Sequence, residues 1–193
     1  MIRTLEDLMY QVSDLFMAPV LVLLVVLFFY SLYALGGFFV QGVQRNRGAV
    51  QFRRLLNDGL QPGTDTPKGY PLAALAVKNS SITKDELDVA ALGEMEAVRM
   101  VSRVAPMLGL IATMIPMGPA LKSLSDGDVQ GISENLIVAF SAVIFGLVVA
   151  SITFFIASTK KKWLAQELVA LLPHVEKRSG RAAEEKGALR EAS

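Results

Sequence analysis

Three long stretches without any charged side chain constrain this chain more than any other feature of its sequence. They cover residues 15–44, 104–121 and 135–159. A helix needs about 20 mostly apolar residues to cross roughly 30 Å of hydrocarbon, and a helix satisfies its backbone hydrogen bonds within itself. The sequence therefore predicts an all-α membrane protein with three transmembrane helices, at 17–40, 104–121 and 135–158.

The composition argues against several classes of function. The chain has 193 residues, no cysteine and one histidine, which excludes disulfides, thiol catalysis and metal sites rich in cysteine or histidine. A net charge of +1 gives no indication of a nucleic-acid partner. We find no nucleotide-binding glycine motif and no convergent set of nucleophile, base and ligands. We therefore expect no metal, no cofactor and no enzymatic activity.

The charges beside the apolar stretches predict the orientation in the membrane. Four arginines follow the first stretch and three lysines follow the third, whereas the loop at 122–134 is mainly acidic. Lys and Arg gather on the cytoplasmic side of inner-membrane proteins. The N-terminus is therefore expected outside, with 41–103 cytoplasmic, 122–134 as an outer hairpin and the C-terminus cytoplasmic.

Local signals divide the rest of the chain. Residues 1–16 have an apolar helical face, which predicts either an outer-face amphipathic helix or an extension of the first span. A capping box at Thr83 and Glu86 begins a helix with no breaker before Pro106, so this helix is expected to run into the second span. The third span is expected to continue as a cytoplasmic helix over 159–176, ending near Pro173. The charged tail at 177–193 is expected to be flexible.

Small residues in the second and third spans predict close helix packing. Gly109 and Pro116 share one face of the second span with Thr113, while Ala142, Gly146 and Ala150 recur every four residues in the third. Small side chains let membrane helices approach each other closely. We therefore expect these five small or ring-shaped residues to lie at helix contacts.

Three polar residues are candidates for an ion pathway. Thr113 lies beside the Ala112 carbonyl, which Pro116 leaves without its helical donor; alternatively, Thr113 bonds only to its own helix. Ser141 and Glu134 share a face of the third helix; alternatively, Ser141 is an ordinary membrane serine and Glu134 a solvated acid at a helix start. The spans contain no central acid, so a proton pathway would need a carboxylate from another subunit.

The pattern Ala-Pro-x-Leu-Gly-Leu-x-x-Thr from Ala105 to Thr113 resembles the second-helix signature of the MotA/TolQ/ExbB proton-channel family. The order of elements is similar too, and the compact loop looks more like the ExbB/TolQ branch. The resemblance implies a homopentamer around a single-span partner similar to ExbD or TolR, whose aspartate meets hydroxyls on the second and third helices. It implies a motor subunit that converts proton-motive force into mechanical work, with Thr113 at the family's second-helix threonine.

The third helix departs from the family pattern. Val143 stands where the family usually has a threonine, three residues before the glycine aligned with Gly146. Ser141 lies on a different side of the helix, and Glu134 is about one turn farther from Gly146 than the family's acid. A non-conducting membrane scaffold with the same fold therefore remains as the alternative function.

Overall fold

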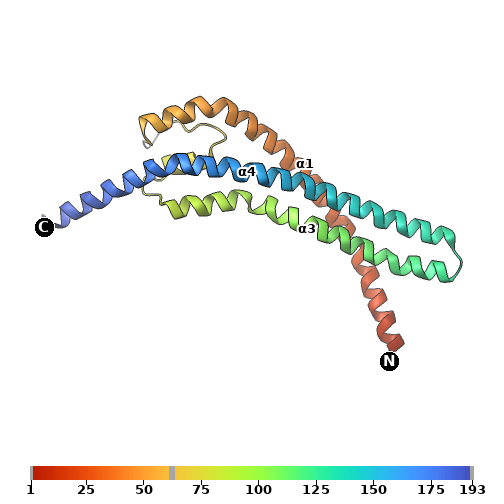
Figure 1. The fold of residues 1–193 in the computed structure, drawn as a ribbon. Coiled ribbons are helices and arrows are strands. Elements are labelled where there is room, and N and C mark those ends of the chain that lie inside the picture. The colour runs from red at the N-terminus through yellow and green to blue at the C-terminus, as the bar shows by residue number, and fades with distance from the viewer. Residues whose placement is uncertain (1, 61–63, 192–193) are drawn as a thin grey trace. The chain divides into compact units, whose positions relative to one another are not determined.

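A computed structural model describes residues 2–60 and 64–191. Within these residues it contains four α-helices and no strand: α1 (Ile2–Asp58), α2 (Pro71–Lys78), α3 (Lys84–Ser125) and α4 (Val129–Glu191) (Figure 1). The predicted all-α fold is confirmed.

Three of these helices are long and apolar enough to cross a membrane. Among the described residues they contain the candidate spans Leu15–Asp58, Lys84–Ser125 and Val129–Arg178, whose best windows have mean hydropathies of 2.7, 1.6 and 2.6. Each is longer than a bilayer requires, since about 20 helical residues suffice. The three predicted membrane helices are confirmed, and each continues beyond its charge-free stretch.

The chain begins with one continuous helix. Residues 2–16 and the first span are both part of α1, which passes through Pro19 and ends at Asp58. Of the two possibilities left open by the sequence, the structure has the extension of the first span. Its exposed apolar side chains include Leu15 and Phe16, so the apolar surface begins ahead of the predicted span at 17–40.

The start of α3 has the predicted capping geometry. The backbone N–H of Glu86 donates to the Thr83 hydroxyl at 3.3 Å, and the Thr83 N–H donates to the Glu86 carboxylate at 2.9 Å. Ile82 and Leu87, on either side of this cap, are both buried. These reciprocal bonds satisfy two otherwise unpaired donors, and α3 then continues through Pro106, as predicted.

The connection between α3 and α4 is shorter than the loop expected over 122–134. Only 126–128 lie outside the helices. Gly127 adopts a left-handed φ of 72°, a conformation that costs glycine little, and the Asp128 N–H donates to the Ser123 carbonyl at 2.8 Å. The Asp128 carboxylate accepts from the Gly131 N–H at 3.0 Å, so this acid caps the start of α4.

The third long helix does not end at Pro173. α4 continues to Glu191, through the segment that the sequence predicted to be flexible. Proline removes one helical hydrogen bond, but the side chains around it are anchored. Leu171 and Val175 are buried, and the Arg178 guanidinium donates to the carbonyls of Leu60 and Ala76 at 2.8 and 2.7 Å. Packing therefore outweighs the local breaker.

The chain divides into two compact units. The first unit comprises Met1–Leu35 and Val98–Ile156, and the second comprises Gly36–Ala97 and Ala157–Ser193. The second unit has an apolar core to which all four helices and the segments beside α2 contribute. Its buried members are Phe52, Leu55, Leu60, Tyr70, Leu72, Ala73, Ala76, Val77, Ile82, Leu87, Ala91, Met95, Leu164, Leu171 and Val175.

Replacing Arg178 with glutamine should destabilise the second unit. The variant removes two charged hydrogen bonds to buried carbonyls, each worth about 1–3 kcal/mol. We expect the midpoint of thermal unfolding to fall by several degrees, measured by circular dichroism in detergent. Lys177→Gln removes a neighbouring exposed cation and should leave the midpoint unchanged. Equal midpoints for the two variants would contradict this role for Arg178.

Candidate functional site

The helices α3 and α4 contact each other in the first unit through two glycines. A Cβ atom added to Gly146 would lie 2.8 Å from the Ala105 carbonyl oxygen and 3.1 Å from the Cα of Gly109. A Cβ added to Gly109 would lie 3.5 Å from both the Ala142 carbonyl oxygen and the Gly146 Cα. The two backbones therefore touch directly, as small-residue membrane contacts allow.

We call this contact the glycine seam and define it by the buried residues of α3 from 105 to 120 and of α4 from 139 to 156. On α4 they alternate three and four residues apart, the spacing of one side of a packed helix pair. Seven of the eleven are glycine or alanine. They are Ala105, Gly109, Ala112, Pro116 and Ala120 on α3, and Ala139, Ala142, Gly146, Val149, Thr153 and Ile156 on α4.

Most of the predicted packing residues lie on this seam. Gly109, Pro116, Ala142 and Gly146 are buried there, and Ala142 also packs with Leu24 of α1 and Ala112. Ala150 is half-buried, one position beyond Val149. Residues spaced four apart move gradually around a helix. The residues that face a packed neighbour are instead spaced three and four apart in turn.

Thr113 lies next to the seam and is half-buried. Its hydroxyl donates to the Leu110 carbonyl at 2.6 Å, so it bonds to its own helix. The hydroxyl oxygen keeps lone pairs that can accept another hydrogen bond. Pro116 is buried and has no N–H to donate to the Ala112 carbonyl. A hydroxyl acceptor and a carbonyl without its helical donor therefore lie one residue apart.

The two candidates on α4 are both exposed. Glu134 accepts a hydrogen bond from the Gln130 amide at 2.9 Å, within the first turns of the helix. Ser141 precedes the buried Ala142 and faces away from the seam. Across residues 2–60 and 64–191, no hydrogen bond joins Thr113, Ser141 and Glu134 to one another. A single subunit therefore does not assemble these three groups into one site.

Two buried hydroxyls were missed by the sequence analysis. Thr153 is fully buried on the seam and donates to the Val149 carbonyl at 2.7 Å. Ser31 is fully buried in α1 and donates to the Phe28 carbonyl at 2.7 Å. The signal for Thr153 was its position seven residues after Gly146, which places both on the same side of the helix.

A buried ion pair lies in the second unit and was also missed. The Arg45 guanidinium of α1 donates to the Glu167 carboxylate of α4 at 3.2 Å, and the Glu167 side chain is fully buried. The same guanidinium donates to the Trp163 carbonyl at 2.9 Å and lies 4.3 Å from the Tyr70 ring centroid. Arginine suits such a position because its planar group both bonds and stacks.

Glu167 also holds the start of α2. Its second carboxylate oxygen accepts from the Ala73 N–H at 2.8 Å, at a helix end where a negative charge is favourable. Burial raises the pKa of Glu167, and the Ala73 N–H and the Arg45 charge oppose that rise. The sequence carried a signal here, because Glu167 lies between Leu164 and Leu171 at the spacing of an apolar helical face. An acid in such a row needs a partner.

No group of three or more histidine, cysteine, aspartate or glutamate residues in the described part of the chain is placed to hold a metal ion. Among the described residues, the notable chemistry thus consists of buried and half-buried hydroxyls and one buried ion pair.

Comparison with known proteins identifies one family. The model of the MotA/TolQ/ExbB proton channel family matches residues 71–173, which include Thr113, the glycine seam from Ala105 to Ile156, and Glu167. No curated protein and no solved structure matches the chain. The match covers more than half of the sequence and agrees with the three membrane helices. This multi-pass membrane protein belongs to the MotA/TolQ/ExbB proton channel family.

Proposed function

We propose that this chain is a proton-channel subunit of an ExbB/TolQ-like motor, which converts proton-motive force into mechanical work. Family membership supports the general function. The observation that carries the specific proposal is Thr113, a half-buried hydroxyl beside the glycine seam and within the matched residues. A hydroxyl that both donates and accepts can pass a hydrogen bond along a water chain.

The proposal includes a second protein. The stretches 104–121 and 135–159 contain no ionisable side chain, whereas proton relays in membranes use titratable groups at depth. A single-span partner similar to ExbD or TolR would supply an aspartate at that depth. We propose a homopentamer of this chain around the partner in the inner membrane, with the N-terminus outside and residues 41–103 cytoplasmic.

A second candidate function is a non-conducting membrane scaffold. Two observations favour it: Val143 stands at the family's usual threonine position, and Thr113 bonds to its own helix. The two candidates differ in ion flux but not in assembly. Flux through the complete complex is therefore the measurement that separates them.

Replacing Thr113 with valine should lower proton flux about tenfold, because one hydrogen-bonded station worth about 1–1.5 kcal/mol is lost. Flux would be measured in liposomes that contain this chain and its co-purified partner. Valine has nearly the shape of threonine, so assembly should be unchanged. Thr113→Ser keeps the hydroxyl and should retain most of the flux.

Ser151→Ala is the matched control, since Ser151 is an exposed hydroxyl on α4 that bonds to its own helix at 2.8 Å. It should conduct normally. Normal flux in Thr113→Val would remove this residue from the pathway. An assembled wild-type complex with no flux at all would favour the scaffold. Failure to co-purify any single-span protein carrying a membrane aspartate would count against both the motor and its partner.

A further inference from the structure

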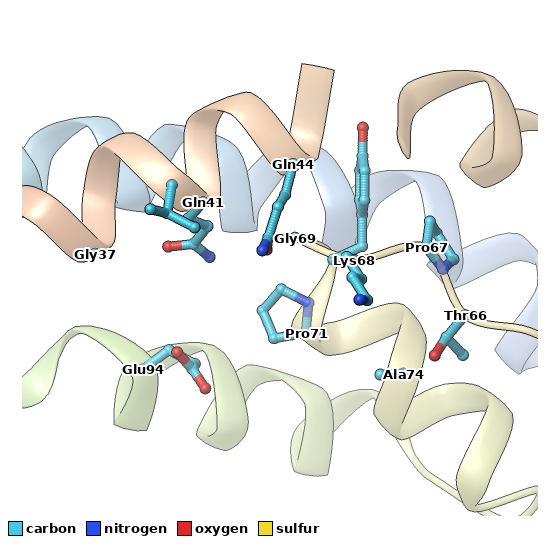
Figure 2. Close-up of a pocket in the computed structure, with 12 residues that line it drawn as sticks. Gly37, Gln41, Gln44, Thr66, Pro67, Lys68, Gly69, Pro71, Ala74 and Glu94 are labelled. Atoms are coloured by element: carbon cyan, nitrogen blue, oxygen red, sulfur yellow. The ribbon is translucent and has the colours of Figure 1, made fainter. Parts of the chain in front are cut away.

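A pocket of about 550 Å³ lies in the second unit. It is lined by one stretch of α1, the segment that leads into α2, the first turn of α2 and one side chain of α3 (Figure 2). Its volume is within the range of pockets that hold small ligands. The lining residues used below are Gly37, Val40, Gln41, Gln44, Lys68 and Glu94.

The backbone gives this pocket a fixed wall. Gly69 has a left-handed φ of 92°, and a Cβ atom there would lie 2.8 Å from the Arg45 backbone nitrogen. Only glycine lets the segment lie this close to α1. Tyr70, the next residue, is buried and stacks on Phe52 with ring centroids 4.2 Å apart. The pocket is therefore built by packed elements rather than by a loose loop.

The wall that α1 contributes changes from apolar to polar along the helix. Gly37 and Val40 belong to the charge-free stretch 15–44, and Gln44 is the last residue of that stretch. Figure 2 shows Gln41 and Gln44 projecting from α1 toward the side where Glu94 of α3 lies. The pocket thus begins where the apolar surface of α1 gives way to polar residues, as at the edge of a bilayer.

Two opposite charges line the pocket without neutralising each other. Lys68 and Glu94 are both exposed and come from different elements. The one ion pair found among the described residues joins Arg45 to Glu167, so neither charge is used in a salt bridge there. An ammonium and a carboxylate in one pocket complement a ligand that carries an anion and a cation together.

We propose that this pocket binds the headgroup of a zwitterionic phospholipid, with its phosphate at Lys68 and its ammonium at Glu94. The amides of Gln41 and Gln44 can donate to phosphate oxygens. The acyl chains would leave past Gly37, where a Cβ atom would meet nothing within 4 Å. Such binding requires this chain to lie in a membrane, but it does not require the chain to conduct protons.

Native mass spectrometry of the purified, delipidated protein tests this binding. Phosphatidylethanolamine should be retained about threefold better than phosphatidylglycerol, since an exposed charge pair contributes at most about a fivefold change in affinity. Phosphatidylglycerol offers the phosphate but no cation for Glu94. Phosphatidylcholine carries a cation that cannot donate a hydrogen bond, so its binding should be intermediate.

Matched variants locate the binding. Gly37→Leu fills the pocket and should abolish the preference, while Gly36→Leu, also with open space at its Cβ but outside the lining, should keep it. Glu94→Gln should equalise the two lipids, and Glu96→Gln, an exposed acid on the same helix, should not. Unchanged thermal melts of Trp163 fluorescence would show that each variant is folded.

Three results would overturn the proposal. One is equal lipid preference in Gly37→Leu and Gly36→Leu. Another is free phosphoethanolamine competing as well as the lipid does, which would identify a soluble ligand. The third is a change in subunit number in Gly37→Leu with unchanged lipid binding, which would show that a second copy of this chain covers the pocket.

Discussion

Replacing Glu167 with alanine is expected to destabilise the second unit by about 3–5 kcal/mol, the usual cost of breaking a buried ion pair. The change leaves the Arg45 guanidinium, whose side chain is 13% exposed, without its carboxylate. It also leaves the Ala73 N–H without its acceptor. Both losses fall on the core that holds α1, α2 and α4 together.

The protein carries its own reporter for this experiment. Trp163 is the single tryptophan, and it stacks on Phe38 with ring centroids 5.1 Å apart, one turn before Glu167. Its fluorescence during denaturation in detergent therefore follows the second unit. Glu176→Ala, an exposed acid on the same helix, is the control and should change stability little.

A double variant distinguishes the effect of losing the ion pair from the effect of the cavity that Glu167→Ala leaves. Arg45→Met with Glu167→Leu removes both charges while keeping apolar volume, and such replacements are often neutral or stabilising. We expect it to be more stable than Glu167→Ala. If Glu167→Ala is as stable as Glu176→Ala, the pair is not important to the fold.

Replacing Gly146 with alanine should destabilise the helix pair of the first unit by about 2–3 kcal/mol, a typical cost of overpacking. The added methyl would lie 2.8 Å from the Ala105 carbonyl oxygen, which is backbone and cannot turn aside. Alanine favours helix by about 1 kcal/mol over glycine, so the clash must outweigh a local gain. Amide hydrogen exchange in nanodiscs should rise in both 105–113 and 142–149.

Gly109→Ala is the same substitution at the other glycine of the contact. Its methyl would meet neighbours no closer than 3.5 Å, an ordinary contact distance. We expect exchange to be unchanged or slower there. Equal protection in the two variants would show that the helices are not held together at Gly146.

The features that could be predicted from sequence are those with a local signal. Charge-free length predicted the three membrane helices, and Thr83 with Glu86 predicted the start of α3. Small residues predicted the glycine seam. The features that were missed depend on contacts between distant segments, since Arg45 and Glu167 are 122 positions apart. The helix after Pro173 was missed for the same reason, because Arg178 bonds to Leu60 and Ala76.

Two side chains of α4 hold opposite ends of α2, and together they specify the direction in which that helix lies. Glu167 accepts from an N–H at the start of α2, and Arg178 donates to a carbonyl near its end. Exchanging Glu167 and Arg178 would conserve net charge. It would, however, place a cation at the positive N-terminal end of α2 and an anion at its negative C-terminal end. The order of these two side chains along α4 therefore sets the direction of α2. Amino-acid composition alone would not reveal that direction.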